Sequence, residues 1–312
     1  MKNRSGVTEV IYEWNYMEEQ PILLRTFLRN QGVSKRLLAK IKFHGGKICL
    51  NGVEENVLVH LKMGDHIRIT VPDEGEHETT TPVDIPIMIV YEDEHLLIVD
   101  KPAGVASIPS RKNPHLSMAN RVKGYYQRQK YADQVIHIVT RLDRDTTGLM
   151  LFAKNRYTHA LFDQQLRAKK VNRFYYALTS ITANLNEEHG FIEAPIGRTD
   201  DSIITREVRE EGKEALTEYW KEEVFAQGQL FRIQLHTGRT HQIRVHFTHV
   251  GAPLIGDTLY GGEVDSIVKR QALHCKELSF IHPFTKEEMK FETGFPNDFQ
   301  EWIKNQRLKE GR

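Results

Sequence analysis

The sequence predicts an α+β protein built from two domains. Apolar residues recur at helical spacing in some segments and alternate with polar residues in others, and these segments follow no regular βαβ order. An acidic, proline-bearing polar stretch, residues 73–83, separates a short N-terminal part from a longer C-terminal part. These observations favour a small α/β domain followed by a larger domain in which strands and helices are mixed.

The composition restricts the class of protein. With 39% hydrophobic and 27% charged residues, the 312-residue chain can bury a sizeable core. No apolar run approaches the roughly 18 residues that a membrane span requires, and the N-terminus lacks the apolar segment of a secretion signal. Cysteine occurs only at Cys49 and Cys275, which argues against a disulfide framework and a thiolate zinc site. We therefore expect a cytoplasmic protein with no membrane contact.

The N-terminal part divides into a segment of residues 1–17, a domain of residues 18–72 and a linker of residues 73–84. In the domain, apolar residues at helical spacing predict two short helices, and Ser34 is suited to cap the second. Asn51-Gly52 between apolar residues predicts a hairpin, and residues 66–71 alternate as a strand does.

The two predicted helices carry a concentration of positive charge. The net charge of the whole chain is only +1, yet residues 24–47 contain no acidic residue. This distribution predicts a phosphate-binding face, although a solvated helix surface rich in lysine is the simpler alternative. Residues 23–52 and 63–71 resemble an S4-type RNA-binding domain, in which basic helix residues bind RNA. The resemblance implies RNA contacts by Arg25, Arg29, Lys35, Arg36 and Lys40.

Residues 85–306 are expected to form the larger domain, and residues 307–312 a polar tail. Its first apolar strand, residues 95–99, ends at the turn Asp100-Lys-Pro-Ala-Gly104. Apolar residues at helical spacing then indicate a helix from about Met118 to Tyr125. The later predicted elements are strands at 149–153, 174–179, 217–220 and 230–235, helices at 156–168 and 241–250, and a hairpin-like stretch at 278–292.

Several common enzyme motifs are missing from the sequence. It has no dinucleotide-binding fingerprint after a strand, no P-loop, no zinc-protease motif and no nucleophile elbow. His236, His241, His246 and His249 suggest a metal site by their number, but a change from strand to helix within the series would direct them to different faces. We therefore expect no metal and no bound cofactor.

Residues 138–148 form the first stretch with the residues for a chemical step. Short carboxylates at Asp143 and Asp145, threonines and a final glycine describe an exposed loop between strands. From spacing alone, the simpler alternative is a turn in which the aspartates bond to their own backbone.

Residues 235–246 form the second such stretch. Thr240 is suited to cap a helix whose buried side includes Ile243 and Phe247. Arg244 then lies about 100° from the buried stripe, at its edge, where a long guanidinium can reach into a cleft. The alternative is a partly buried arginine that pairs with a structural acid.

Together these stretches resemble the RluA-type family of pseudouridine synthases. Arg141-Leu-Asp143, followed by Asp145-Thr-Thr-Gly148, matches the catalytic loop of that family. The other matching motifs are Asp100-Lys-Pro-Ala-Gly104, Arg173-Phe-Tyr-Tyr-Ala177, Gly238-Arg-Thr-His-Gln-Ile-Arg244 with Gly256-Asp257 and Tyr260-Gly261, and Ala272-Leu-His274.

The resemblance implies roles for individual residues. Asp143 would be the nucleophile, Tyr175 the active-site tyrosine, and Arg244 the partner of Asp143. One position departs from the family, because Thr140 stands where a histidine usually precedes Arg-Leu-Asp, and this puts any role of that histidine in doubt. The substrate-binding residues implied by the motifs are Arg141, Leu142, Arg239 and Leu273, the last of which would pack on the target base.

The resemblance also implies the fold and the reaction. The expected fold is a mixed, mainly antiparallel sheet flanked by helices, and the expected reaction is isomerisation of uridine to pseudouridine in RNA, which needs no cofactor. The S4-type domain favours large-subunit ribosomal RNA, with transfer RNA as an alternative, and we expect a monomer. The main rival is a catalytically inactive S4-containing factor in ribosome assembly. An S4-linked methyltransferase would need a glycine-rich donor loop that the sequence does not show.

Overall fold

The computed structural model describes residues 10–72, 74, 80–110, 114–181, 185 and 187–310, with Glu310 described for its backbone alone. Residues 1–9 of the expected N-terminal segment, residues 73 and 75–79 of the expected linker, and residues 311–312 of the expected tail lie outside this range. No helix of the described chain is both long and apolar enough to span a membrane.

The N-terminal domain is an antiparallel four-stranded sheet with two helices, and its strand order is β1-β4-β2-β3. Ser34 caps the second helix as predicted, since its hydroxyl accepts a hydrogen bond of 3.1 Å from the Leu37 amide. The elements are β1 (Val10–Asn15), α1 (Leu24–Asn30), α2 (Lys35–Phe43), β2 (Lys47–Leu50), β3 (Val53–Glu54) and β4 (His66–Val71).

The expected boundary at residue 18 was wrong for the first strand. β1 pairs with β4 along its whole length, from Val10 opposite Val71 to Asn15 opposite His66. Tyr12 from this strand is buried in the core of the domain. The domain therefore begins at least at Val10, within the segment that the sequence analysis set apart.

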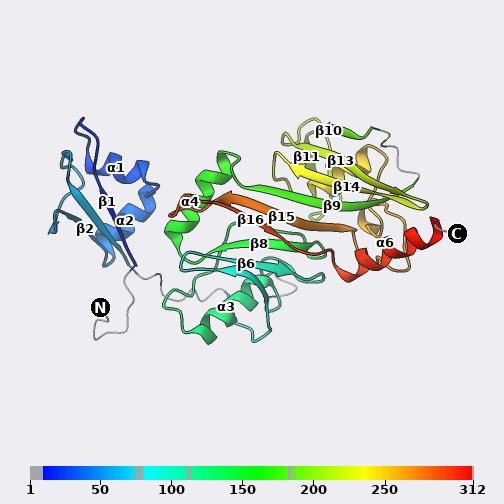
Figure 1. Cartoon of the computed structure of the whole chain (residues 1–312), viewed down its shortest axis with the longest axis horizontal. Helices are drawn as coiled ribbons and strands as arrows, with labels where there is room; N and C mark the ends of the chain where they lie inside the picture. Colours follow the sequence, from blue (N-terminus) through cyan, green and yellow to red (C-terminus); the bar gives the residue numbers. More distant parts are fainter. Residues whose placement is uncertain are drawn as a thin grey trace.

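The N-terminal domain shares an aromatic core with helix α4 (Arg156–Arg167) of the larger domain, which lies beside it in Figure 1. The ring of Tyr12 lies 4.5 Å from that of Tyr157 and 5.3 Å from that of Phe284, measured between centroids. The Tyr157 hydroxyl also donates a hydrogen bond of 2.6 Å to the Gln31 carbonyl. At Gly32 a Cβ atom would lie 2.3 Å from a methyl carbon of Leu161, so glycine permits this close approach.

Glu74, in the expected linker, is bound to the larger domain. Its side chain is only 2% exposed and lies 3.0 Å from both His137 Nε2 and Arg156 Nε. The Arg156 amide donates a further hydrogen bond of 2.7 Å to the same carboxylate. Burial alone would raise the pKa of Glu74, but His137 and Arg156 outweigh it and lower the pKa to about 2. Glu74 therefore attaches the linker to the larger domain.

We expect the Glu74 contacts to stabilise the fold in a pH-dependent way. Because the folded-state pKa is depressed, the contribution is full above the ordinary carboxyl pKa and is lost as the pH falls toward about 2. Urea unfolding from pH 7 to pH 3 should show a Glu74→Gln deficit of up to about 3 kcal/mol at neutral pH that shrinks below pH 5. Glu94→Gln, at an exposed position, is the control; a Glu74→Gln deficit independent of pH would contradict the assignment.

The larger domain is built on a ten-stranded mixed sheet, which confirms the expected α+β class. The main strand order is β10-β13-β14-β9-β15-β8-β6-β5, with β16 on β15 and β7 on β8. A separate hairpin joins β11 (Ile196–Arg198) and β12 (Arg206–Val208). The strands of the large sheet are β5 (Met88–Glu92), β6 (Leu96–Lys101), β7 (His137–Ile138), β8 (Thr147–Ala153), β9 (Asn172–Ser180), β10 (His189–Glu193), β13 (Leu216–Phe225), β14 (Gly228–Leu235), β15 (Leu273–Ile281) and β16 (Glu288–Glu292).

Helices cover both faces of this sheet. Helix α5 (Gln242–His249) packs against one face, where Phe247 joins the cluster of Phe231. Helix α6 (Asn297–Glu310) packs on the other face, where Trp302 joins the cluster of Leu230. The remaining helices are α3 (Met118–Gln129), α4, and the short 3-10 helix η1 (Thr258–Tyr260).

Helix α6 was not predicted from the sequence, and its last turn lies in residues that were wrongly assigned to a polar tail. Arg307 lies within the helix and pairs with Glu223 at 2.8 Å. Figure 1 shows this helix at the end of the sheet opposite the N-terminal domain.

One parallel strand pair determines where the two chemical stretches meet. β8 and β15 run parallel, with Thr147 opposite His274 and Gly148 opposite Cys275. Because the two strands run in the same direction, the loops that lead into them lie at the same edge of the sheet. At Gly148, whose φ is +109°, a Cβ atom would lie 2.1 Å from the Cys275 carbonyl oxygen. Glycine at the end of the 138–148 stretch is thus required by the close approach of the strands.

Candidate active site

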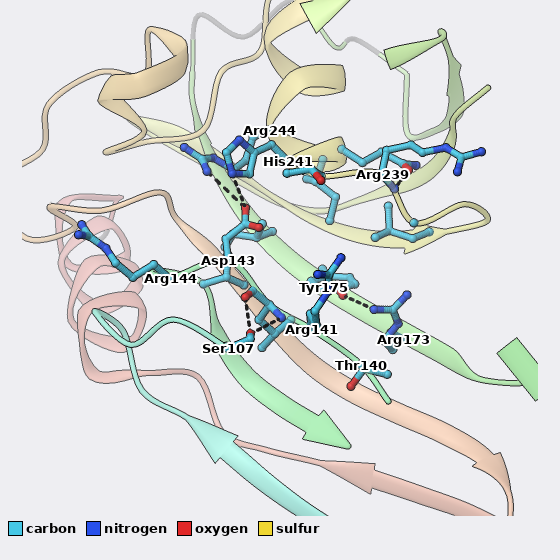
Figure 2. A pocket seen from close by; sticks show the side chains of 18 of the residues that line it. Ser107, Thr140, Arg141, Asp143, Arg144, Arg173, Tyr175, Arg239, His241 and Arg244 are labelled. Carbon is cyan, nitrogen blue, oxygen red and sulfur yellow. Dashed lines mark hydrogen bonds and ion pairs between the residues drawn. The ribbon is translucent and has the colours of Figure 1, made fainter. Parts of the chain in front are cut away.

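A cavity of about 490 Å³ opens at this edge of the sheet and brings the predicted site residues together (Figure 2). The loop before β8, strand β9, the loop after β14, helix α5 and the start of β15 all contribute to its wall. Five arginines, one aspartate and one tyrosine are among its lining side chains. The predicted residues that line it are Asp143, Tyr175, Arg244, Arg141, Leu142, Arg239 and Leu273.

Asp143 is held on a loop that is anchored on either side of it. The Ser107 hydroxyl donates to the Leu142 carbonyl at 2.6 Å and accepts from the Leu142 amide at 3.0 Å. Behind the loop, Lys101 Nζ donates to the carbonyls of Val105 and Arg144 at 2.9 and 2.8 Å. The Asp143 side chain remains 26% exposed, so its carboxylate is presented to the cavity rather than bonded back into its own turn.

Arg244 pairs with two carboxylates. Its Nε and one terminal nitrogen each donate to Asp257 at 2.7 Å, a two-point contact in which Asp257 is only 2% exposed. The other terminal nitrogen donates to Asp143 at 3.3 Å, as the dashed line in Figure 2 shows. Burial alone would lower the pKa of Arg244, but Asp257 and then Asp143 raise it, so the guanidinium is charged. Arg244 therefore reaches into the cavity and also pairs with a buried acid, so it combines the two alternatives that the sequence left open.

Tyr175 forms part of the cavity wall. Its side chain is 4% exposed, and its hydroxyl accepts a hydrogen bond of 3.2 Å from Arg173. Burial raises the pKa of the phenol, so it stays protonated near neutral pH. Its neighbour Tyr176 points to the opposite face of β9, where it packs against Phe295. Only Tyr175 of the two adjacent tyrosines therefore lines the cavity.

His241 lines the cavity, although the sequence assigned it no role of its own beyond its place in a family motif. Its Nε2 lies 3.9 Å from an Asp143 oxygen, and its Nδ1 is 2.8 Å from the Tyr260 hydroxyl. Burial lowers the pKa of this imidazole. Its φ of 58° lies in the left-handed region, which is uncommon for residues other than glycine and occurs often at functional sites.

The predicted cap at Thr240 was wrong. His241 is the N-cap residue of α5, and no side chain caps the helix there. Instead, the Gln242 side chain accepts hydrogen bonds from the Arg239 amide at 3.0 Å and from the Thr237 hydroxyl at 2.8 Å. A side chain inside the helix therefore stabilises the turn that precedes it.

Thr140, the position that departs from the family pattern, is buried at 2% exposure. Its hydroxyl accepts a hydrogen bond of 2.9 Å from the Leu151 amide, which joins the loop to β8. The residue therefore connects the active-site loop to the sheet through the backbone, and no acid–base task is needed to explain its position.

Two further residues fix the loop and carried no separate role in the sequence analysis. Lys101 is fully buried, and burial lowers its pKa to about 7. Arg270 donates to the Asp145 and Leu273 carbonyls at 2.8 and 3.2 Å while pairing with Asp298 of α6. Arg270 thus joins the loops that enter both parallel strands. Its signal in sequence was weak, because it belongs to none of the family motifs.

The histidine series does not converge on one point. His236 contacts Glu218 at 2.7 Å, while His246 contacts Thr217 and the Ala194 carbonyl, each at 2.9 Å. These contacts explain the half-buried His236 and the buried His246 by ordinary hydrogen bonding. The predicted RNA-binding residues lie elsewhere, on α1 and α2: Arg25, Arg29, Lys35 and Arg36 are exposed and Lys40 is half-buried.

A cavity that holds five arginines around one carboxylate is suited to a negatively charged substrate such as a nucleic acid. The sequence profile of the RNA pseudouridylate synthases matches residues 95–249. An uncharacterized RNA pseudouridine synthase of Bacillus subtilis is 44% identical over 88% of this chain and 96% of its own length. The large-subunit pseudouridine synthase D of Pseudomonas aeruginosa is 40% identical over 69% of this chain and 70% of its own. The chain belongs to the RluA-type RNA pseudouridine synthases and isomerises uridine to pseudouridine in RNA.

Solved structures support the same fold. The human RNA pseudouridylate synthase domain-containing protein 4 aligns with a TM-score of 0.57 at 20% identity, over 70% of this chain and 93% of its own. The human domain-containing protein 1 aligns with a TM-score of 0.54 at 24% identity, over 68% of this chain and 84% of its own.

Proposed function

We propose that Asp143 is the nucleophile of this pseudouridine synthase, and the observation that carries the proposal is its place in the cavity beside Arg244. The reaction breaks the bond between C1′ and N1, turns the uracil and joins C5 to C1′. A carboxylate must arrive ionised to attack or to promote these steps. Arg244, itself charged and fixed by Asp257, places a positive charge 3.3 Å from that carboxylate.

The other cavity residues are assigned to binding and orientation of the flipped nucleotide. A paired uridine has to leave the base stack before its glycosidic bond can be reached. Tyr175 would stack on the uracil, a contact worth about 1–3 kcal/mol per base, and Leu142 and Leu273 would complete the apolar wall. Arg141 and Arg239 are assigned to RNA phosphates because both are cations that line the cavity.

We propose large-subunit ribosomal RNA as the substrate. The Pseudomonas aeruginosa relative carries that target in its name. The exposed cations of α1 and α2 supply a second, sequence-independent RNA contact of the kind expected from an S4-type domain. The N-terminal domain would then bind the RNA while the cavity receives the uridine.

Tritium release tests the enzymatic assignment. Because C5 exchanges its hydrogen for the C1′ carbon, RNA labelled with tritium at uridine C5 must lose the label to water. We expect release from ribosomal RNA without any added cofactor, and mapping of pseudouridines in a strain that lacks the protein should identify the position. RNA binding without tritium release from any RNA would instead support the inactive assembly factor.

Removing charge from α1 and α2 should weaken RNA binding. The triple change of Arg29, Lys35 and Arg36 to alanine should lower the slope of log K against log salt, by about 0.7–0.9 for each phosphate that the helices no longer neutralise. The effect is expected in affinity, measured by titration at several salt concentrations. A matched triple change at exposed Lys62, Lys290 and Lys304 controls for net charge. An unaltered slope for the first variant would mean that these residues are solvated and do not contact RNA phosphates.

A further inference from the structure

A second cavity adjoins the candidate active site. It has a volume of about 420 Å³, within the range of small-molecule sites, and it shares the wall formed by residues 238–240 with the first cavity. The β11–β12 hairpin and the turn at 211–213 form its other walls. The substrate-binding residues that the sequence predicted, Arg239 excepted, do not line this second cavity.

The second cavity has an excess of positive charge. Arg198, Arg206, Lys213 and Arg239 line it, opposed by the single carboxylate of Glu211. Because the Glu211 carboxylate already pairs with Arg209 Nε at 3.5 Å, it neutralises the other cations less. The side chains of two of the four cations, Arg198 and Lys213, are exposed and make no ion pair or hydrogen bond to another described residue. The Arg198 backbone carbonyl accepts a hydrogen bond of 2.7 Å from Arg209.

Arg206 and Arg239 are held in place by backbone carbonyls. Arg206 donates from one terminal nitrogen to the carbonyls of Ile204 and Thr205 at 3.0 and 2.8 Å, and so fixes the hairpin. Arg239 donates through Nε to the Glu214 carbonyl at 2.9 Å. Figure 2 shows the guanidinium of Arg239 directed away from Asp143, while its backbone stays in the shared wall. The charge of Arg239 therefore lies away from Asp143, on the wall that the two cavities share.

We propose that the second cavity binds a backbone phosphate of the RNA, one within two nucleotides of the uridine held in the first cavity. This proposal rests on the proposed function. Consecutive nucleotides are covalently linked, so a base placed in the first cavity brings its neighbouring phosphates to the shared wall. Arginine and lysine without a partner in a recess suit a phosphate, and the planar guanidinium of arginine can bind two of its oxygens.

The test combines charge removal on the protein with charge removal on the RNA. The variant carries Arg198→Ala and Lys213→Ala, and a set of substrate RNAs carries one neutral methylphosphonate at successive positions around the target uridine. For the wild-type enzyme, one flanking position should raise Kd about tenfold, the scale of removing one charge-assisted hydrogen bond. The variant should show the same rise with ordinary RNA and no further rise with the methylphosphonate at that position.

The control variant, with Lys290→Ala and Lys304→Ala, removes the same charge from exposed positions outside both cavities. It should keep the wild-type response at every methylphosphonate position. Additive reductions in affinity for the cavity variant would overturn the proposal. A second outcome would also overturn it: inorganic phosphate competes with RNA for binding, yet the cavity variant and the methylphosphonate still lower the affinity independently. The cavity would then be assigned to a free anion. Tritium release by the wild-type enzyme is measured in parallel, so its absence would count against the proposed function, while release with additive reductions would count against this subsite alone.

Discussion

Replacing Asp143 by asparagine should abolish pseudouridine formation, with a fall in the single-turnover rate on the order of 10⁴-fold or more. An amide neither carries the negative charge nor attacks as a nucleophile. Its oxygen can still accept the hydrogen bond from Arg244, and the Leu142 backbone remains anchored by Ser107. The melting temperature and most of the RNA affinity should therefore survive. Tritium release at saturating enzyme, thermal melting and RNA titration measure the three quantities.

Asp145→Asn is the matched control for Asp143→Asn. Both aspartates lie on the same loop, but the Asp145 carboxylate pairs with the exposed Arg144 at 3.0 Å and does not line the cavity. We expect this variant to retain activity. If Asp145→Asn lost activity and Asp143→Asn kept it, the assignment of the nucleophile would be wrong.

Replacing Arg244 by methionine should reduce both activity and stability. The change keeps an apolar stem but leaves the buried carboxylate of Asp257 without its partner. Breaking a buried ion pair in this way costs about 3–5 kcal/mol of folding free energy. Loss of a positioned cation next to the reacting carboxylate should lower the single-turnover rate on the order of 100-fold or more. Urea unfolding and tritium release measure the two effects on the same preparations.

Companion variants separate the two roles of Arg244. Arg244→Lys restores charge without the planar fork that binds Asp257 at two points, so only partial recovery is expected. Arg239→Met, another arginine of the cavity wall, has no carboxylate partner in the described chain and should change the stability by less than about 1 kcal/mol. Full activity of Arg244→Met at a denaturant concentration where it stays folded would limit Arg244 to a structural role.

The sequence predicted most of the catalytic domain because its strands and helices carry strong periodic patterns. The segments that became β8, β9, β14 and α5 were each located within a few residues. Two elements were missed although their signals were present. Val10, Tyr12 and Trp14 alternate as β1 requires, and Phe299, Trp302 and Ile303 have the spacing of α6. The residues of β1 had been assigned to the N-terminal segment, and only the last turn of α6 to the polar tail.

Other features could not be predicted because they depend on contacts between distant parts of the chain. Nothing local in residues 147–148 indicates a parallel pairing with residues 274–275, yet this pairing brings Asp143 to Leu273. The second partner of Arg244 was hidden for the same reason, since Asp257 carries no periodic signal and reaches the guanidinium only through the turn after α5. The family motifs identified the site residues, whereas the distances between them could be obtained only from the tertiary structure.

The aromatic core that joins the N-terminal domain to the larger domain fixes the distance between the two proposed RNA contacts, the basic helices and the cavity. With Tyr12, Tyr157 and Phe284 packed together, the basic helices and the cavity keep a set separation. Under the proposed function, capture of an RNA by the first contact presents its uridine to the second at a high effective concentration, provided that the RNA has the matching span. Avidity would then select RNAs by length. A fragment that contains the correct uridine but is too short to reach both contacts would bind only with the affinity of a single contact.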